Sequence, residues 1–289
     1  MIAQKSDRQR LLLVCLRGIQ SLVISGGLLV CQTARASDSA IAELQYQFAR
    51  QVDHRLALPL ADQARYIKLL ERALTQSGIV ELTPQMFLLV DRSPSVQAAF
   101  LLLFNAPRKW HWIGATSVST GKPEGFEHFI TPTGIFLHAP HNPDYRATGA
   151  YNENHIRGYG VRGMRVYDFG WQLAERGWGN GGISRMRLAM HATDPVRLEG
   201  RLGTVASEGC IRIPTSLNHF LDHYGILDLE YESALKEGKA MRVLLPDRQA
   251  VPWQGRYMVV IDSESRTRPH WASRPSVPLN KSGQKAIAR

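Results

Sequence analysis

A histidine and a cysteine in this sequence stand in contexts that suit covalent chemistry. Residues 187–190 form a short run that is typical of a strand and ends at His191. Further along, Gly209 directly precedes Cys210, and a glycine there allows a tight turn that exposes the sulfur and aims backbone N–H groups at a reacting carbonyl. The imidazole could take the thiol proton, and a nearby imidazolium or Arg212 would lower the thiol pKa. These residue types suit a thiol nucleophile with a histidine base, but a single His–Cys pair at this distance is weak evidence, because most such pairs never meet in the folded chain.

Two ordered blocks of sequence resemble the YkuD-type L,D-transpeptidase family. That family has a His, a gap, then Ser/Thr-His-Gly-Cys, a hydrophobic residue and Arg or Asn. The chain matches this pattern at His191-Ala192-Thr193 and at residues 207–212, Ser-Glu-Gly-Cys-Ile-Arg. The upstream block of the family is matched by residues 119–122, Ser-Thr-Gly-Lys, and 131–136, Thr-Pro-Thr-Gly-Ile-Phe. The resemblance covers residues 84–246.

The resemblance implies a fold, a reaction and site residues. The implied fold is mostly β, a small YkuD-like sandwich or barrel-like catalytic domain preceded by a helical hairpin. The implied reaction is peptidoglycan cross-linking, of 3→3 or 1→3 type, through a cysteine thioester and without a metal or organic cofactor. In this reaction Cys210 would be the nucleophile and His191 the base, with the imidazole oriented by the Ala192 carbonyl. Backbone N–H groups near Gly209 would stabilise the oxyanion. Arg212 and Ser207 would bind the substrate. A carboxypeptidase or hydrolase acting on wall stem peptides, and a non-catalytic wall-binding relative, are the alternatives.

One position departs from the family pattern. Glu208 stands where the family has a second histidine beside the sulfur. A carboxylate that points inward there would raise the thiol pKa, whereas one that points outward could bind an amine of the acceptor substrate. Glu208 therefore marks a divergent branch of the family.

Two other enzyme classes fit less well. Papain-like and related wall peptidases place the cysteine before the histidine, whereas here His191 precedes Cys210. A metal site could draw on His138, His141, Asp144 and His155. Prolines at 140 and 143 disfavour a helical histidine pair, and no second ligand motif such as H-E-x-x-H is present.

Residues 1–36 have the features of an export signal. Basic residues precede an apolar stretch over 11–31, and Ala34-Arg35-Ala36 suits a signal peptidase. The uninterrupted apolar run is about half of the ~20 residues that a spanning helix needs. Cleavage would remove Cys15 and Cys31, so that Cys210 would be the one cysteine left, unpaired, in an exported protein. We therefore expect a periplasmic protein with a reactive thiol and no stable membrane span after cleavage.

The net charge of +10 indicates an anionic partner. Outside the cytosol, peptidoglycan carboxylates and anionic lipid surfaces are such partners. The sequence carries no zinc-finger spacing and no aromatic RNA-binding motif, so nucleic acid is not expected.

The remaining sequence predicts the elements that must position the site. Apolar spacing predicts a helical region over 37–83, broken at Pro59, ahead of the catalytic domain over 84–246. Apolar runs predict strands at 86–90, 98–104, 110–114, 242–245 and 257–261, and a helix over 214–236. The Gly-rich aromatic stretch 138–187 is predicted to be a long loop, either a lid over a substrate groove or an ordered insertion. Residues 247–289 are predicted to be a basic, largely flexible tail that could lie along an acidic surface.

Overall fold

The computed structural model describes residues 38–105 and 109–274, in two compact units, Met1–Tyr46 and Gln47–Arg289. Residues 38–46 of the first unit are helical, and residues 47–51 of the second are helical too. The predicted signal over 1–36 and residues 275–289 of the predicted tail lie outside the described residues. Within the described part of the chain, no helix combines the length and the apolar character that crossing a membrane requires.

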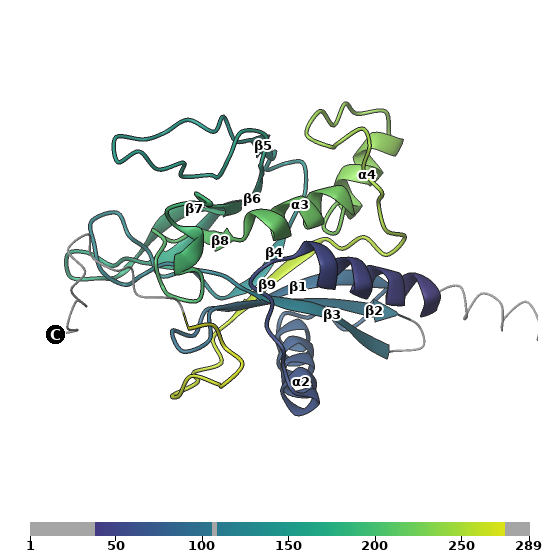
Figure 1. Cartoon of the computed structure of the whole chain (residues 1–289), viewed down its shortest axis with the longest axis horizontal. Helices are drawn as coiled ribbons and strands as arrows, with labels where there is room; N and C mark the ends of the chain where they lie inside the picture. The colour runs from purple at the N-terminus through teal and green to yellow at the C-terminus, as the bar shows by residue number, and fades with distance from the viewer. Residues whose placement is uncertain (1–37, 106–108, 275–289) are drawn as a thin grey trace, which may run out of the picture. The chain divides into compact units, whose positions relative to one another are not determined.

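A five-stranded sheet forms one layer of the second unit. Its strands, in spatial order, are β3 (Lys109–Ser117), β2 (Ala98–Asn105), β1 (Gln85–Asp91), β9 (Tyr257–Ile261) and β4 (Gly134–Leu137). The β1–β9 pair is parallel and the other pairs are antiparallel. Every residue of β1 is buried, which explains its unbroken apolar run, because both faces of the sheet are covered. Figure 1 shows α2 on one side of this sheet and the second sheet on the other.

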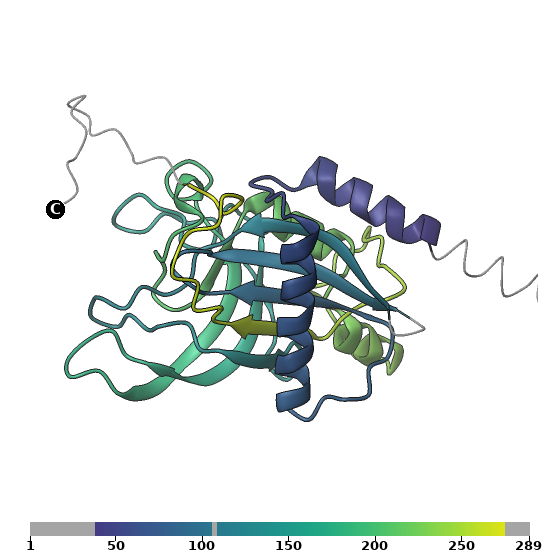
Figure 2. The same cartoon turned by 90° about the horizontal axis from the view of Figure 1, so that it is seen from below.

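Helix α2 (Leu60–Gln76) crosses one face of the five-stranded sheet (Figure 2). It begins after Pro59, whose fixed φ suits a helix start, and it buries Tyr66, Leu70 and Leu74 at helical spacing. These side chains belong to one core with the strands of the sheet. The α2 part of the helical region predicted over 37–83 is therefore not separate from the domain predicted over 84–246, because α2 shares the core of that domain.

A four-stranded sheet carries the predicted site residues. Its order is β5 (Tyr145–Arg146), β6 (Arg165–Glu175), β7 (Ile183–Ala192) and β8 (Ile211–Ile213), with β7 and β8 parallel. The prediction of one long loop over 138–187 is wrong, since it contains β5, β6 and the first half of β7. The apolar alternation of β6 is interrupted at Gly170, which has φ +75° and lies at a register shift between Asp168 and Trp171. The irregular segment is the shorter stretch 147–164.

Two further predictions are corrected in the C-terminal part. The predicted helix over 214–236 is two helices, α3 (Thr215–His223) and α4 (Leu229–Lys236), because Gly225 takes a φ of +55° between them. The predicted strand over 242–245 is a turn, in which the Val243 carbonyl accepts a hydrogen bond from Arg146 instead of a ladder partner. A single turn of 3-10 helix, η1 (Glu199–Arg201), precedes β8.

The predicted domain boundary at 246 is too early. The confirmed strand β9 lies between β1 and β4, and beyond it Trp271 is 7% exposed. The Trp271 indole N–H donates to Asp62 on α2 at 2.9 Å, which holds this part of the chain to the domain. The described part of the predicted tail is thus packed, since it completes the sheet and its core.

The fold of the described residues is mixed, with two sheets and several helices. Each sheet has two outer strands and does not close into a barrel: β3 and β4 bound the larger sheet, and β5 and β8 the smaller. The prediction of a mostly β domain therefore holds only in part, because α2, α3 and α4 contribute to the packing around the sheets.

A buried cluster of charged side chains ties β6 to the helices. The guanidinium of Arg165 contacts Asp144 at 2.7 Å, Asp222 at 3.3 Å and Asp228 at 2.7 Å. His138 bonds the same Asp144 at 2.9 Å, and these five side chains are almost fully buried. Buried charges are stable only when they are paired, so the cluster fixes the helices relative to the sheet that carries the site.

Replacing Asp228 with alanine is expected to lower the free energy of unfolding by about 3 kcal/mol, because it leaves the buried Arg165 guanidinium without two of its bonds. Urea denaturation followed by circular dichroism measures this change. Glu237→Ala is the matched control, because its ion pair with Lys239 is exposed and contributes little. Equal effects of the two substitutions would contradict the role given to the cluster.

Candidate active site

The parallel ladder of β7 and β8 brings the predicted site residues together. His191 pairs directly with Arg212, so their side chains lie on one face of the sheet. Cys210 precedes Arg212 by two residues, which places its side chain on the same face. All three residues line one cavity of about 390 Å³. The geometry thus joins a thiol, an imidazole and a guanidinium that are separated in the sequence.

His191 is held as a neutral base. Its Nδ1 lies 2.7 Å from the Ala192 carbonyl oxygen, which can only accept, so Nδ1 carries the proton and Nε2 is free to receive one. The edge of the Tyr159 ring packs against the imidazole, with ring centroids 4.7 Å apart. Burial lowers the pKa of His191 to about 4, against the opposing effect of the Ala192 carbonyl.

The turn before β8 is braced by hydrogen bonds from side chains. Gly209 has φ +133°, a conformation that favours glycine, and its N–H donates to the Ser207 hydroxyl oxygen at 3.2 Å. The Ser207 hydroxyl in turn donates to the Cys210 carbonyl. In this structure the Gly209 N–H is engaged within the turn, and the Ser207 hydroxyl braces that turn while Ser207 lines the same cavity as Cys210.

The two upstream sequence blocks hold this turn in place. The Thr131 hydroxyl donates to the Gly209 carbonyl at 2.6 Å and accepts from the Gly121 N–H at 2.8 Å. A Cβ on Gly121 would lie 1.9 Å from the Phe129 carbonyl oxygen and 2.9 Å from Gly209 Cα, so only glycine fits. Ser119 exchanges backbone hydrogen bonds with Arg212. These contacts explain physically why both blocks accompany the cysteine motif.

The Cys210 thiol is protonated in the resting structure. Burial raises its pKa, and Glu208 and Asp168 act in the same direction, while the Ala189 N–H and Arg212 oppose them. Its Sγ lies 3.8 Å from the Arg187 carbonyl, to which the thiol donates. Arg212 acts in the expected direction and lowers the thiol pKa, but burial outweighs it, and a neutral His191 supplies no imidazolium charge, so the net pKa shift is upward.

This pair of pKa shifts predicts the pH dependence of Cys210 reactivity. Because His191 is neutral above about pH 4 and the Cys210 pKa is raised, no thiolate–imidazolium pair exists at pH 7. We expect the iodoacetamide alkylation rate of Cys210 to rise about tenfold per pH unit from pH 7 to 9. Peptide mass mapping of timed samples measures it. A rate that is constant from pH 5 to 8 would indicate a preformed ion pair instead.

Arg212 lines the cavity and also has one buried donor without a protein partner. Its Nη1 donates to the Ala206 carbonyl at 2.8 Å, whereas its buried Nε has no hydrogen-bond partner among the residues described. A buried N–H without a partner is costly, and an anionic ligand would satisfy it. Arg212 is therefore suited to bind a carboxylate beside Cys210. Glu208 lines the same cavity and is exposed.

A second cavity, of about 370 Å³, reaches Cys210 from another side. Apart from Cys210, the residues that line it were not predicted as site residues. They are Tyr145, Tyr159, Asp168, Arg187 and Ala189. Arg187 Nε is held by Asp168 at 2.6 Å, and its side chain is 48% exposed. Strand alternation from His191 back to Arg187 is the sequence signal that could have placed this arginine on the site face. Cys210 and Tyr159 line both cavities.

The segment 147–164 borders the site, whereas the predicted metal ligands lie in different places. Asn152, Asn154 and Ile156 of this segment line the cavity that holds His191, as expected of a lid. His138 and Asp144, by contrast, bond each other within the buried Arg165 cluster. His155 lines a separate cavity. The structure thus gives His138 and Asp144 a structural role.

No protein-family model matches the chain, and no curated protein matches it either.

Proposed function

We propose that this protein is a peptidoglycan L,D-transpeptidase with Cys210 as nucleophile and His191 as base. The observation that carries the proposal is the parallel pairing of His191 with Arg212, which gathers imidazole, thiol and guanidinium around one cavity. In this proposal the two sheets form a YkuD-type catalytic domain. The two upstream blocks that brace the Gly209 turn support it.

In the acylation step, Cys210 Sγ attacks the carbonyl of the diamino-acid residue in a tetrapeptide stem. His191 Nε2 accepts the thiol proton as the S–C bond forms, because the thiol is not ionised beforehand. The backbone N–H of Cys210 is a candidate donor to the oxyanion. Collapse breaks the C–N bond, His191 returns its proton to the departing amine, and terminal D-alanine leaves a thioester on Cys210.

In the transfer step, the amine of a second stem peptide takes the position that the amine of the departed D-alanine occupied. His191 takes a proton from this amine as it attacks the thioester, and Cys210 leaves as the thiolate and regains a proton. Both amines exchange protons with His191, so both occupy the 390 Å³ cavity that contains it. The acyl chain then lies in the 370 Å³ cavity, which reaches Cys210 but is not lined by His191.

The charged residues of the two cavities suit peptide stems. The guanidinium of Arg212, which lines the cavity of His191, would attract the carboxylate of the departing D-alanine. Glu208, on the rim of the same cavity, attracts the ammonium form of the acceptor. The partner would be peptidoglycan and the location periplasmic, after export by the signal predicted over residues 1–36.

Mass spectrometry of reaction products tests the proposal. The protein is incubated with purified tetrapeptide-stem muropeptides, beside the same protein after Cys210 has been alkylated. A cross-linked dimer that only the unmodified protein forms is expected, and fragmentation would identify the joined positions. Loss of D-alanine without a dimer would indicate a carboxypeptidase. No product at all would favour a non-catalytic wall-binding protein.

Replacing Arg212 with glutamine is expected to lower kcat/KM for the tetrapeptide donor by about 10- to 100-fold, which corresponds to the loss of charge-assisted hydrogen bonds. Lysine at this position should restore part of the activity, because it keeps the charge but not the planar geometry. Steady-state kinetics of D-alanine release measures both. Arg185→Gln is the control, since Arg185 is exposed on the neighbouring strand β7 and lines neither cavity. Equal activity of the two glutamine variants would refute the anchoring role.

A further inference from the structure

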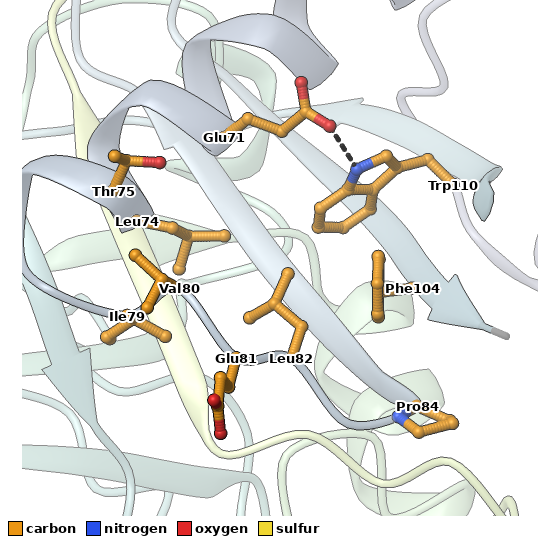
Figure 3. A pocket seen from close by; sticks show the side chains of 10 residues that line it. All are labelled: Glu71, Leu74, Thr75, Ile79, Val80, Glu81, Leu82, Pro84, Phe104 and Trp110. Atoms are coloured by element: carbon orange, nitrogen blue, oxygen red, sulfur yellow. Dashed lines mark hydrogen bonds between the residues drawn. The ribbon is translucent and has the colours of Figure 1, made fainter. Parts of the chain in front are cut away.

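A groove of about 770 Å³ lies apart from Cys210. It is lined by the C-terminal half of α2, the segment that follows α2, and the facing ends of β2 and β3 (Figure 3). None of its lining residues borders the two cavities at Cys210. Whatever this groove binds, it does so independently of the proposed reaction.

The groove carries acidic groups at its two sides and apolar side chains between them. Figure 3 shows Glu71 and Glu81 at opposite sides, with Leu74, Val80 and Leu82 between them. The Trp110 indole N–H donates to Glu71 at 2.8 Å, which fixes that carboxylate. Val80 is 70% exposed, and no basic residue is found among the described residues of the lining. The groove therefore suits a ligand with two cationic groups and an apolar group between them.

The floor of the groove also offers an unpaired backbone. Residues 80–83 belong to no helix or strand, and within the described chain their N–H and carbonyl groups make no backbone hydrogen bond. Such a segment can pair with an added strand, which supplies affinity through main-chain hydrogen bonds. An extended peptide fits this groove better than a compact ligand does.

We propose that residues 285–289 of this chain, Lys-Ala-Ile-Ala-Arg, bind in the groove as an added strand. In an extended peptide alternate side chains share a face, so Lys285, Ile287 and Arg289 point the same way. Their order, basic, apolar, basic, complements Glu71, the apolar side chains and Glu81.

The path of the chain brings this segment within reach. Trp271 is held beside the N-terminal half of α2 by its bond to Asp62 and by the Tyr66 ring at 6.0 Å. Glu71 lies nine helical residues beyond Asp62, which is about 14 Å along α2. Lys285 follows Trp271 by fourteen residues, which can span up to about 46 Å when extended. The connection is long enough with slack to spare.

Disulfide trapping in the full chain tests this proposal. The three native cysteines are replaced by serine, and cysteines are placed at Val80 and Ile287. Mild oxidation is expected to form the Val80–Ile287 disulfide within one chain at least tenfold faster than a Leu235–Ile287 pair, because Leu235 lies on α4 outside the groove. Peptide mapping by mass spectrometry identifies the link, and non-reducing electrophoresis separates links within a chain from links between chains.

Charge exchange makes the test specific. Glu81→Lys should reduce the trapping rate about tenfold, and adding Lys285→Glu and Arg289→Glu to it should restore most of that rate. Glu81 makes no side-chain hydrogen bond among the described residues, so its replacement does not disturb the fold, and a melting curve checks this. Rates that ignore all these charges would overturn the proposal. A disulfide between chains instead of within one would overturn it too, because the occupant would then be a second copy.

Discussion

Replacing Cys210 with alanine is expected to lower the rate of D-alanine release from a tetrapeptide stem by at least about 10⁴-fold, with no detectable acyl-enzyme. The reason is chemical: Cys210 is the one cysteine in the described chain, and it lines the same cavity as His191. Without the sulfur the thioester cannot form, and only non-covalent binding remains. Intact-protein mass spectrometry after mixing with the stem measures the acyl-enzyme, and chromatography measures D-alanine.

Serine at the same position provides the matched control. A hydroxyl is nearly isosteric with the thiol but has a much higher pKa, and His191 is too weak a base to compensate. Cys210→Ser should therefore keep the melting temperature and stem binding while losing nearly all turnover. Alanine and serine variants that still release D-alanine at rates near the wild type would show that the nucleophile is a different group.

The sequence predicted the strands that are buried on both faces. The apolar runs at 86–90, 98–104 and 257–261 correspond to β1, β2 and β9, since burial on both faces leaves no polar positions to obscure the pattern. Strand β6 was missed because its buried first half contains charged residues, only its second half has exposed positions, and Gly170 interrupts the alternation. Residues 242–245 have the composition of a strand but lack a partner edge, because β9 occupies the place beside β1. The apolar pattern of a short segment does not determine which of two candidate strands pairs with the edge of β1.

The site itself depended on pairing that no single strand reveals. From the residues alone, His191 and Cys210 were separate candidates, and the family resemblance joined them. The β7–β8 register supplies the physical reason for their proximity. The second cavity and the Arg165 cluster could not be foreseen, since their members are dispersed: Asp144, Arg165 and Asp228 belong to three different elements. Burial of a charge is visible only after the chain has folded around it.

Replacing His191 with glutamine is expected to reduce the transfer rate by about 10²- to 10⁴-fold, the usual contribution of a general base. An amide can accept a hydrogen bond in place of Nε2, but it cannot carry the proton from the thiol to the departing amine. His219→Gln on α3 is the matched control, since His219 is exposed and lines neither cavity at Cys210. Initial rates of cross-linked product, measured by chromatography, test the prediction.

A second measurement separates a base from a structural support. The resting thiol does not owe its ionisation to His191, because burial keeps that imidazole neutral and holds the Cys210 pKa high. At pH 9, where hydroxide and not His191 removes the proton from the reacting fraction of the thiol, iodoacetamide should therefore alkylate Cys210 at nearly the same rate in the wild type and in His191→Gln. Transfer would fall while alkylation stays constant. If both fell together, His191 would act by holding the turn at Cys210 and not by moving protons.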